Sequence, residues 1–156
     1  MSGRKHPDWE AGFARLLEKK VFLLGVGNPL RGDDAFGPGL IGRIEYAPKL
    51  DAGTTPENVI FKIKAANPPA VLILDAVDFG GKPGELRLMR ASEAQNPNIS
   101  THSLSLSVFA EFFEPACPVW LLGVQPRSIE FGAPLSRELR CASEAVAAVF
   151  KRLAGQ

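Results

Sequence analysis

Three largely apolar runs divide the chain, at residues 21–26, 70–75 and 119–124, and the second of them ends in Asp75. None of them alternates between polar and apolar side chains, so we expect central strands that are covered by helices on both faces. Residues 85–90 do alternate in this way, which is typical of a half-exposed strand. We therefore expect residues 85–90 to form an antiparallel strand at one edge of the sheet.

Apolar residues at helical spacing separate these strands. The first predicted helix precedes residue 21 and carries four apolar side chains on one face: Trp9, Phe13, Leu16 and Leu17. Further helices are predicted from about Phe36, from Thr55, through Leu106 to Phe113, and from Ser136 to about Leu153.

The helix after Thr55 has a strong start signal, because Thr55 suits the N-cap and Pro56 suits the first helical position. The β-branched residues that follow favour a strand, but the Ala65-to-Pro68 segment suits the end of a helix. We predict a helix of about three turns. Its inward side chains would be Val59, Ile60 and Ile63.

Strands that alternate with helices predict a three-layer α/β/α sandwich with a mostly parallel, mixed sheet of about five strands. We expect residues 1–20 to form an N-terminal extension with a peripheral helix, and residues 21–156 to form a single α/β domain. Ligand sites in such sheets lie at the carboxyl ends of the strands.

The composition is that of an ordinary globular protein, with 46% hydrophobic and 22% charged residues among 156. The formal net charge is +1 and like charges are not clustered, so we expect no nucleic-acid or membrane partner. The apolar runs are far shorter than the ~20 residues that span a bilayer, and the N-terminus lacks a signal-peptide core. We expect a cytoplasmic protein.

The first apolar run ends in a glycine turn, Gly25-Val26-Gly27, that is similar to the start of a dinucleotide-binding loop. The third glycine of that fingerprint is missing, since Pro29 and Leu30 follow. Two carboxylates, Asp33 and Asp34, would also repel a pyrophosphate. No organic cofactor is expected.

Three segments are predicted to bring polar side chains to the carboxyl edge of the sheet: the loop with Asp33 and Asp34, the strand that ends in Asp75, and the helix start with His102. Each has a structural explanation when it is taken alone, since acids complement a helix N-terminus and a histidine can cap one. Asp75 is harder to explain in this way, because a carboxylate at the end of a buried strand is costly without a cation or donors. Together the three would supply two oxygens and one nitrogen, a set that suits zinc or nickel.

Nucleophilic catalysis has weaker support. Cys117 and Cys141 lack metal or redox spacing and are expected to be buried reduced thiols, with Cys141 on the apolar side of the last helix. Ser103 and Ser105 lack the G-x-S-x-G elbow.

Six segments together resemble the hydrogenase maturation endopeptidases, which trim the C-terminus of the large subunit of NiFe hydrogenases. They are GVGNPLRGDDAFG, DAGT, LILDAVDFG, PGELRL, STHSLSL and LLGVQP, in this order. The resemblance runs from about residue 21 to residue 153. It is greatest to the branch that serves the hydrogenase-3, or formate hydrogenlyase, type of enzyme.

The resemblance implies a protease that recognises nickel already installed in its substrate, the large-subunit precursor, and releases a short C-terminal peptide. The metal-contacting residues of the family map onto Asp34, Asp75 and His102, and Asp33 is expected to be structural. Nickel would come with the substrate. A carboxylate could act as general base while nickel polarises the scissile carbonyl, or nickel could only position the substrate. We expect a monomer.

The chain departs from the family pattern between Ile44 and Asp51, where it is several residues shorter than usual. The second strand is therefore expected at roughly residues 49–51, or to be nearly absent. Two other functions stay open from sequence: a non-catalytic chaperone that binds nickel or the precursor on the same scaffold, and a hydrolase with its own tightly bound metal.

Overall fold

The computed structural model describes residues 9–95 and 106–155, and five strands within them form one sheet in the order β2-β1-β3-β5-β4. The bounds are β1 (Phe22–Gly25), β2 (Lys49–Asp51), β3 (Val71–Ala76), β4 (Leu86–Arg90) and β5 (Val119–Val124). The pairs β2-β1, β1-β3 and β3-β5 are parallel, and β4 pairs antiparallel with β5 at one edge. The predicted mixed sheet and its antiparallel edge strand are confirmed.

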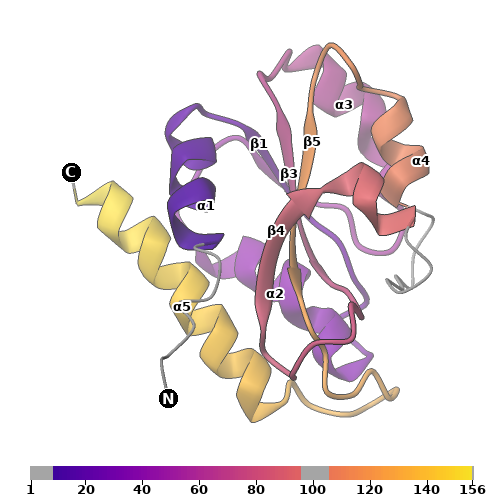
Figure 1. Ribbon diagram of the computed structural model, residues 1–156, viewed down its shortest axis with the longest axis vertical. Coiled ribbons are helices and arrows are strands. Elements are labelled where there is room, and N and C mark those ends of the chain that lie inside the picture. The colour runs from indigo at the N-terminus through magenta and orange to yellow at the C-terminus, as the bar shows by residue number, and fades with distance from the viewer. Residues whose placement is uncertain (1–8, 96–105, 156) are drawn as a thin grey trace.

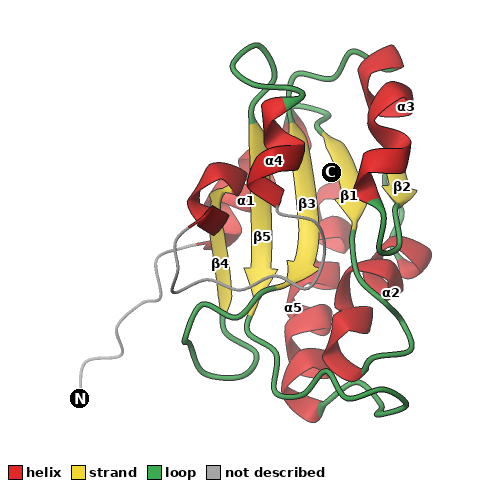
Figure 2. Cartoon of the chain, turned by 90° about the vertical axis from the view of Figure 1, so that its right-hand side faces the viewer, coloured by secondary structure: helices red, strands yellow, loops and turns green. Residues whose placement is uncertain are grey.

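Helices cover both faces of this sheet (Figures 1 and 2). One face carries α1 (Trp9–Glu18), α2 (Phe36–Arg43) and α5 (Arg137–Ala154), and the other carries α3 (Ile60–Ala65) and α4 (Leu106–Glu111). Three short 3-10 helices connect these elements: η1 (Gly32–Ala35), η2 (Pro56–Val59) and η3 (Ala91–Gln95). The three-layer architecture expected from the sequence is therefore confirmed.

The central strands divide the interior into two apolar cores. Leu72 and Leu74 of β3 enter the core beneath α1, α2 and α5, while Ile73 enters the core beneath α3 and α4. All six residues of β3 are buried, and so are all four of β1. Because both faces of these strands are covered, their sequences show no polar alternation.

The first and last helices agree with the prediction. Helix α1 buries Phe13, Leu16 and Leu17 and packs against α5 and β4. Helix α5 begins after Ser136, whose Oγ accepts a hydrogen bond from the backbone N–H of Leu139 at 3.3 Å. This is an N-cap, and it provides a partner for one of the donors at the start of the helix.

The predicted three-turn helix after Thr55 is wrong in its first half. Thr55 makes no side-chain capping bond, and the 3-10 turn η2 precedes a short α3. The β-branched Val59 has a φ of −112°, outside the helical range, and η2 ends at this residue, directly before α3. Ile60 and Ile63 are buried as predicted, whereas Val59 is only partly buried.

The prediction that both cysteines are buried is also wrong. Cys141 is exposed and Cys117 is only partly buried. The buried stripe of α5 passes through Leu139, Ala142 and Val146, which leaves Cys141 on the outer side of the helix. Helix α4 also ends earlier than expected, at Glu111, so that Phe112 lies beyond it and is exposed.

Strand β2 occupies residues 49–51, as expected from the short connection before it. Its first residue has a second role, because Lys49 Nζ donates hydrogen bonds to the backbone oxygens of Ile41 (2.8 Å) and Ile44 (2.7 Å). These carbonyls lie at the C-terminal end of α2, where the helix itself leaves them without partners. The short second strand therefore also supports the helix that follows the acid-bearing loop.

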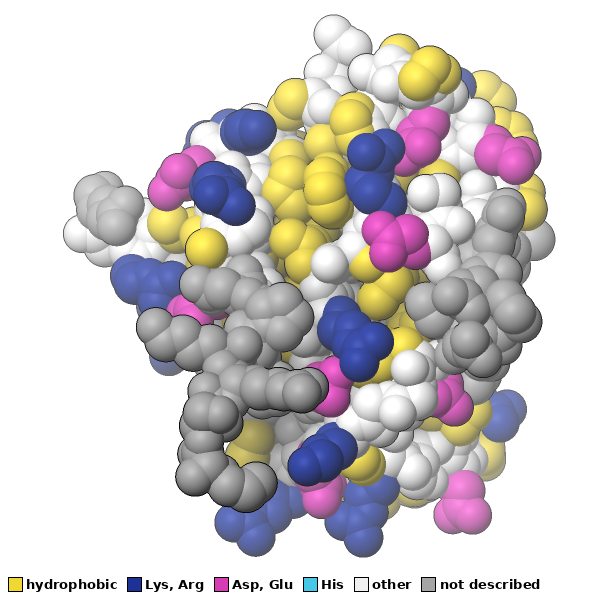
Figure 3. Space-filling view, in the orientation of Figure 1, with side chains coloured by type: hydrophobic (Ala, Val, Ile, Leu, Met, Phe, Trp, Pro, Cys, Tyr) yellow, Lys and Arg dark blue, Asp and Glu magenta, His cyan; other side chains and the backbone are white. Residues whose placement is uncertain are grey.

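On the face drawn in Figure 3, Lys and Arg side chains lie interspersed with Asp and Glu side chains. Ion pairs near the protein surface include Arg87–Glu85 and Arg127–Glu138. Such pairs contribute little to stability because water screens them. Within the part of the chain that the structure describes, no helix is both long enough and apolar enough to cross a membrane.

The close approach of α2 to the sheet gives a first prediction. A Cβ at Gly37 would overlap the backbone oxygens of Val26 and Leu74, whereas a Cβ at Gly39 would meet nothing within 4 Å. We expect Gly37→Ala to lower the free energy of unfolding by about 1–3 kcal/mol, and Gly39→Ala to raise it by about 0.5–1 kcal/mol. Urea denaturation of both variants measures this, and equal effects would contradict the packing described here.

Candidate active site

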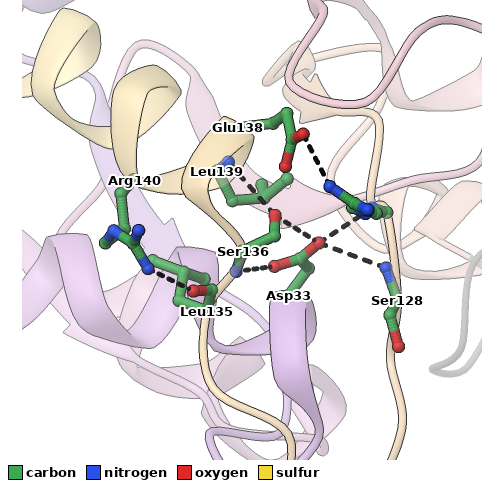
Figure 4. A network of polar contacts seen from close by, with 8 residues as sticks. Asp33, Ser128, Leu135, Ser136, Glu138, Leu139 and Arg140 are labelled. Carbon is green, nitrogen blue, oxygen red and sulfur yellow. Dashed lines mark hydrogen bonds and ion pairs between the residues drawn. The ribbon is translucent and has the colours of Figure 1, made fainter.

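Asp33 joins the loop after β1 to the loop after β5 (Figure 4). Its carboxylate is fully buried and accepts four hydrogen bonds. Oδ2 accepts from the backbone N–H groups of Arg127 (2.8 Å) and Ser128 (3.2 Å), and from Ser136 Oγ (2.9 Å). Oδ1 accepts from the backbone N–H of Ser136 at 2.7 Å.

These contacts connect three segments that are distant in the sequence. The backbone N–H of Asp33 also donates to the backbone oxygen of Ser128 at 2.9 Å, so side chain and main chain hold the same loop. Ser136 is the N-cap of α5, which places the Asp33 carboxylate at the positive end of that helix. The structural role expected for Asp33 is confirmed, but its partners lie about a hundred residues away rather than in its own helix.

Asp34 belongs to a different environment from its neighbour. Its side chain is 4% exposed, and Oδ2 accepts a hydrogen bond from the backbone N–H of Asn28 at 2.8 Å. Gly27 has a φ of +146°, and a Cβ there would overlap the backbone oxygen of Asp34. The glycine turn therefore makes room for the acid-bearing loop.

Asp75 lies at the carboxyl end of β3, beside β1, and is 2% exposed. Burial raises the pKa of its carboxyl group well above the ordinary value, and the nearby charge of Asp34 raises it further. A hydrogen bond from the backbone N–H of Ala76 acts in the opposite direction but is the weakest of the three effects. The structure thus brings two of the predicted site residues together, in an arrangement that would favour a cation between them.

His102, the third predicted residue, lies outside the residues that the structure describes. Within residues 9–95 and 106–155, no group of three or more His, Cys, Asp and Glu side chains could hold a metal ion. The described part of the site therefore supplies two carboxylates, and a complete metal-binding set would need a further group.

Gln125, at the end of β5, organises the loop after β3. Its Oε1 accepts hydrogen bonds from the backbone N–H groups of Phe79 (2.9 Å) and Gly81 (3.0 Å). Its Nε2 donates to Asp78 Oδ1 at 3.1 Å. Gln125 thus lies at the carboxyl edge of the sheet, where its side chain supports the loop after β3.

The sequence did not single out Asn28, which contacts Asp34 through its backbone and accepts a hydrogen bond from the backbone N–H of Leu30 through its side chain. The signal was present, because an Asn-Pro pair directly after a strand is typical of a turn. Cys117 is not an activated nucleophile, since burial and the charge of Glu114 raise the pKa of its thiol.

Comparison with known proteins identifies the family. The sequence profile of the hydrogenase maturation proteases matches residues 43–152, well over half of the chain. The chain belongs to this family. As a member of this family, the chain is a peptide hydrolase. The resemblance noted in its sequence is confirmed.

Individual relatives agree with this assignment. The hydrogenase 3 maturation protease of Escherichia coli K12 is 36% identical over 140 residues, which cover 85% of this chain and 88% of that protein. The crystal structure of the HycI protease from Thermococcus kodakarensis KOD1 has a TM-score of 0.75 at 28% identity, covering 90% of this chain and 99% of that one. The solution structure of the E. coli endopeptidase HycI has a TM-score of 0.73 at 29% identity, covering 87% and 92%. The expected likeness to the hydrogenase-3 type is confirmed.

Asp33 gives a prediction on stability. Asp33→Asn would replace one acceptor oxygen with an NH2 group that faces hydrogen-bond donors, so at least one buried donor would lose its partner. We expect the free energy of unfolding to fall by about 2–3 kcal/mol in urea denaturation.

Asp51→Asn is the matched control, because Asp51 is exposed and its carboxylate accepts a hydrogen bond from the backbone N–H of Gly53 at 2.9 Å. A change within about 0.5 kcal/mol is expected for this variant. Equal losses in the two variants would refute the bridging role of Asp33.

Asp75 gives a prediction on pH. Because the pKa of Asp75 is raised in the folded protein, the unfolded chain releases this proton at lower pH than the folded chain does. The stability that the protonated carboxyl contributes is fully present below its ordinary pKa of 3.8 and is lost as the pH rises through the raised value. Asp75→Asn removes this loss, so the variant should gain stability relative to the wild type as the pH rises above about 4.

The expected gain is about 1.4 kcal/mol for each pH unit that separates the folded and unfolded pKa values of Asp75. Urea denaturation in the presence of a chelator measures it without interference from stray cations. Glu144→Gln, which neutralises an exposed acid on α5, should show no such gain. Parallel stability curves for the wild type and Asp75→Asn would show that the Asp75 charge is not disfavoured.

Proposed function

We propose that this hydrogenase maturation protease removes the C-terminal extension of a hydrogenase large-subunit precursor that already carries nickel. The observation that supports the proposal best is the pair of buried carboxylates, Asp34 and Asp75, at the carboxyl edge of the sheet. A site that disfavours its own negative charge gains free energy when a divalent cation enters it. Nickel in the substrate would be such a cation.

His102 would complete the set that contacts nickel. Two carboxylate oxygens and one imidazole nitrogen suit nickel, and three protein groups leave coordination positions for the substrate's own ligands. In this proposal nickel belongs to the precursor, and the protease recognises it without holding a metal of its own. An empty precursor would lack the cation that relieves the repulsion between Asp34 and Asp75.

Asp75 is suited to move a proton during cleavage. A carboxylate beside the scissile bond can act as a general base, and Asp75 lies buried at the carboxyl edge of the sheet. It could accept a proton from a water molecule that attacks the scissile carbonyl, with nickel polarising that carbonyl. In the other arrangement, nickel only orients the precursor, and its contribution is the positioning of the peptide bond.

The proposal is tested with the purified protease and a nickel-loaded precursor, using mass spectrometry to follow the loss of a C-terminal peptide. We expect Asp34→Ala, Asp75→Ala and His102→Ala each to slow processing by at least about 100-fold, since even outer-shell partners of metal sites are commonly worth 10–100-fold. Glu144→Gln should process normally, because this exposed acid lies on α5. Full processing by Asp75→Ala would refute the metal-contact role.

Two further measurements separate this function from its competitors. A non-catalytic chaperone would bind the loaded precursor stably without any loss of mass. A hydrolase with its own metal would contain nearly one equivalent of metal when isolated and would cut a nickel-free precursor. The proposed protease should be largely metal-free as isolated and should leave the nickel-free precursor intact.

A further inference from the structure

Two large apolar side chains are exposed to solvent on the loops that form the candidate active site. Leu30, in the loop after β1, is 61% exposed, and Phe131, in the loop after β5, is 73% exposed. The backbone N–H of Gly132, the residue after Phe131, donates to the backbone oxygen of Leu30 at 2.8 Å. The two loops are therefore hydrogen-bonded to each other beside these side chains. Both loops lie at the lower end of the sheet in Figures 1 and 2. We call this pair the apolar rim.

The apolar rim is continuous with the buried carboxylates. The side chain of Asn28 accepts a hydrogen bond from the backbone N–H of Leu30 at 2.9 Å, and the backbone N–H of Asn28 donates to Asp34 Oδ2 at 2.8 Å. One residue therefore connects the rim to an acid of the site. On the other side, Asp33 holds Ser128, three residues before Phe131.

These loops are held in place even though their apolar side chains are exposed. Gly132 N–H, Asn28 Oδ1 and the Asp33 carboxylate each fix one of the two loops by hydrogen bonds. A surface that is ordered before its partner arrives loses less conformational entropy on binding. Exposed apolar side chains on a fixed rim are thus suited to bind a partner rather than to fill the interior.

The position of the rim identifies its partner. An endopeptidase must lay a stretch of polypeptide across its active site, and that stretch extends in both directions from the bond that is cut. Side chains of the substrate that flank the scissile bond would meet the rim first, because it adjoins Asp34. Apolar side chains of the substrate would remove Leu30 and Phe131 from water, which favours binding.

We propose that the apolar rim, Leu30 and Phe131, binds apolar side chains of the hydrogenase large-subunit precursor beside the scissile bond. The inference rests on the proposed function and adds a specificity-determining contact to it. The two carboxylates would select for the cation, whereas the rim would select for the polypeptide around it. The rim contributes binding that is the same in ground state and transition state, so its loss should change KM rather than kcat.

The test compares Leu30→Ser/Phe131→Ser with wild type in cleavage of the nickel-loaded precursor. We expect KM for the precursor to rise by about tenfold or more, with kcat at saturating precursor unchanged. Leu30→Met/Phe131→Leu preserves the apolar surface and should retain a KM close to that of the wild type. Circular dichroism and urea denaturation should show that both double variants fold normally, because both positions are exposed.

Phe61→Ser is the matched control. Phe61 is 86% exposed on α3, on the opposite face of the sheet from α2, so it offers the same chemistry away from the loops. Its KM should equal that of the wild type. An equal rise in KM for Phe61→Ser would mean that exposed apolar residues affect precursor binding wherever they lie on the surface, and the inference would be wrong.

Failure of the inference and failure of the proposed function give different results. If the wild-type protein does not cut the loaded precursor, the proposed function is wrong. If the wild type cuts and the Ser double variant cuts with the same KM, the rim does not bind the substrate. If sedimentation shows a wild-type dimer that the double variant loses, with KM unchanged, the rim instead contacts a second copy of this chain and the inference fails.

Discussion

The carboxylate of Asp33 holds together the parts of this protein on which the candidate active site depends. Its four hydrogen bonds reach two backbone N–H groups of the loop after β5 and both donors of the residue that caps α5. A buried charge is tolerated here because donors surround it and the positive end of a helix faces it. The loops after β1 and β5 are therefore joined through this one side chain.

Two buried carboxylates near the carboxyl edge of the sheet thus lie in opposite electrostatic environments. Asp33 is buried among donors that stabilise its charge, whereas Asp75, which feels the charge of Asp34, is buried where its charge is disfavoured. Under the proposed function, the first arrangement stabilises the free protein and the second prepares it for a cation. The protein would then discriminate between loaded and empty precursors because only the loaded one relieves the cost at Asp75.

The architecture was largely predictable because it depends on local patterns. Strands that are buried on both faces contain no polar alternation, whereas β4, at the edge of the sheet, carries the exposed Arg87 and the half-buried Arg90 beside its buried residues. The α3 region was not predictable, because the β-branched residues after Pro56 compete with a good start signal and only tertiary packing decides between them. The exposure of Cys141 was mispredicted because the next residue, Ala142, lies on the buried face of α5, and one step along a helix moves a side chain to a different side.

The site was predictable in its parts but not in its connections. The positions of Asp34 and Asp75 follow from strand ends, which a sequence reveals. The bonds from Asp33 to Ser136, and from Gln125 to Phe79, join loops that are distant in the chain, and nothing local specifies them. Leu30 and Phe131 carry no sequence pattern, since their exposure became visible only when the two loops were placed side by side.

Gly37 has a consequence for the spacing of the two acids. Its missing side chain lets α2 rest against the main chain at Val26 and Leu74, so that the helix lies directly on both central strands. Asp34 is three residues before this contact, and Asp75 is the residue after Leu74. A larger residue at position 37 would push α2 and the loop that carries Asp34 away from the strand that carries Asp75, so this glycine helps to keep the two acids close.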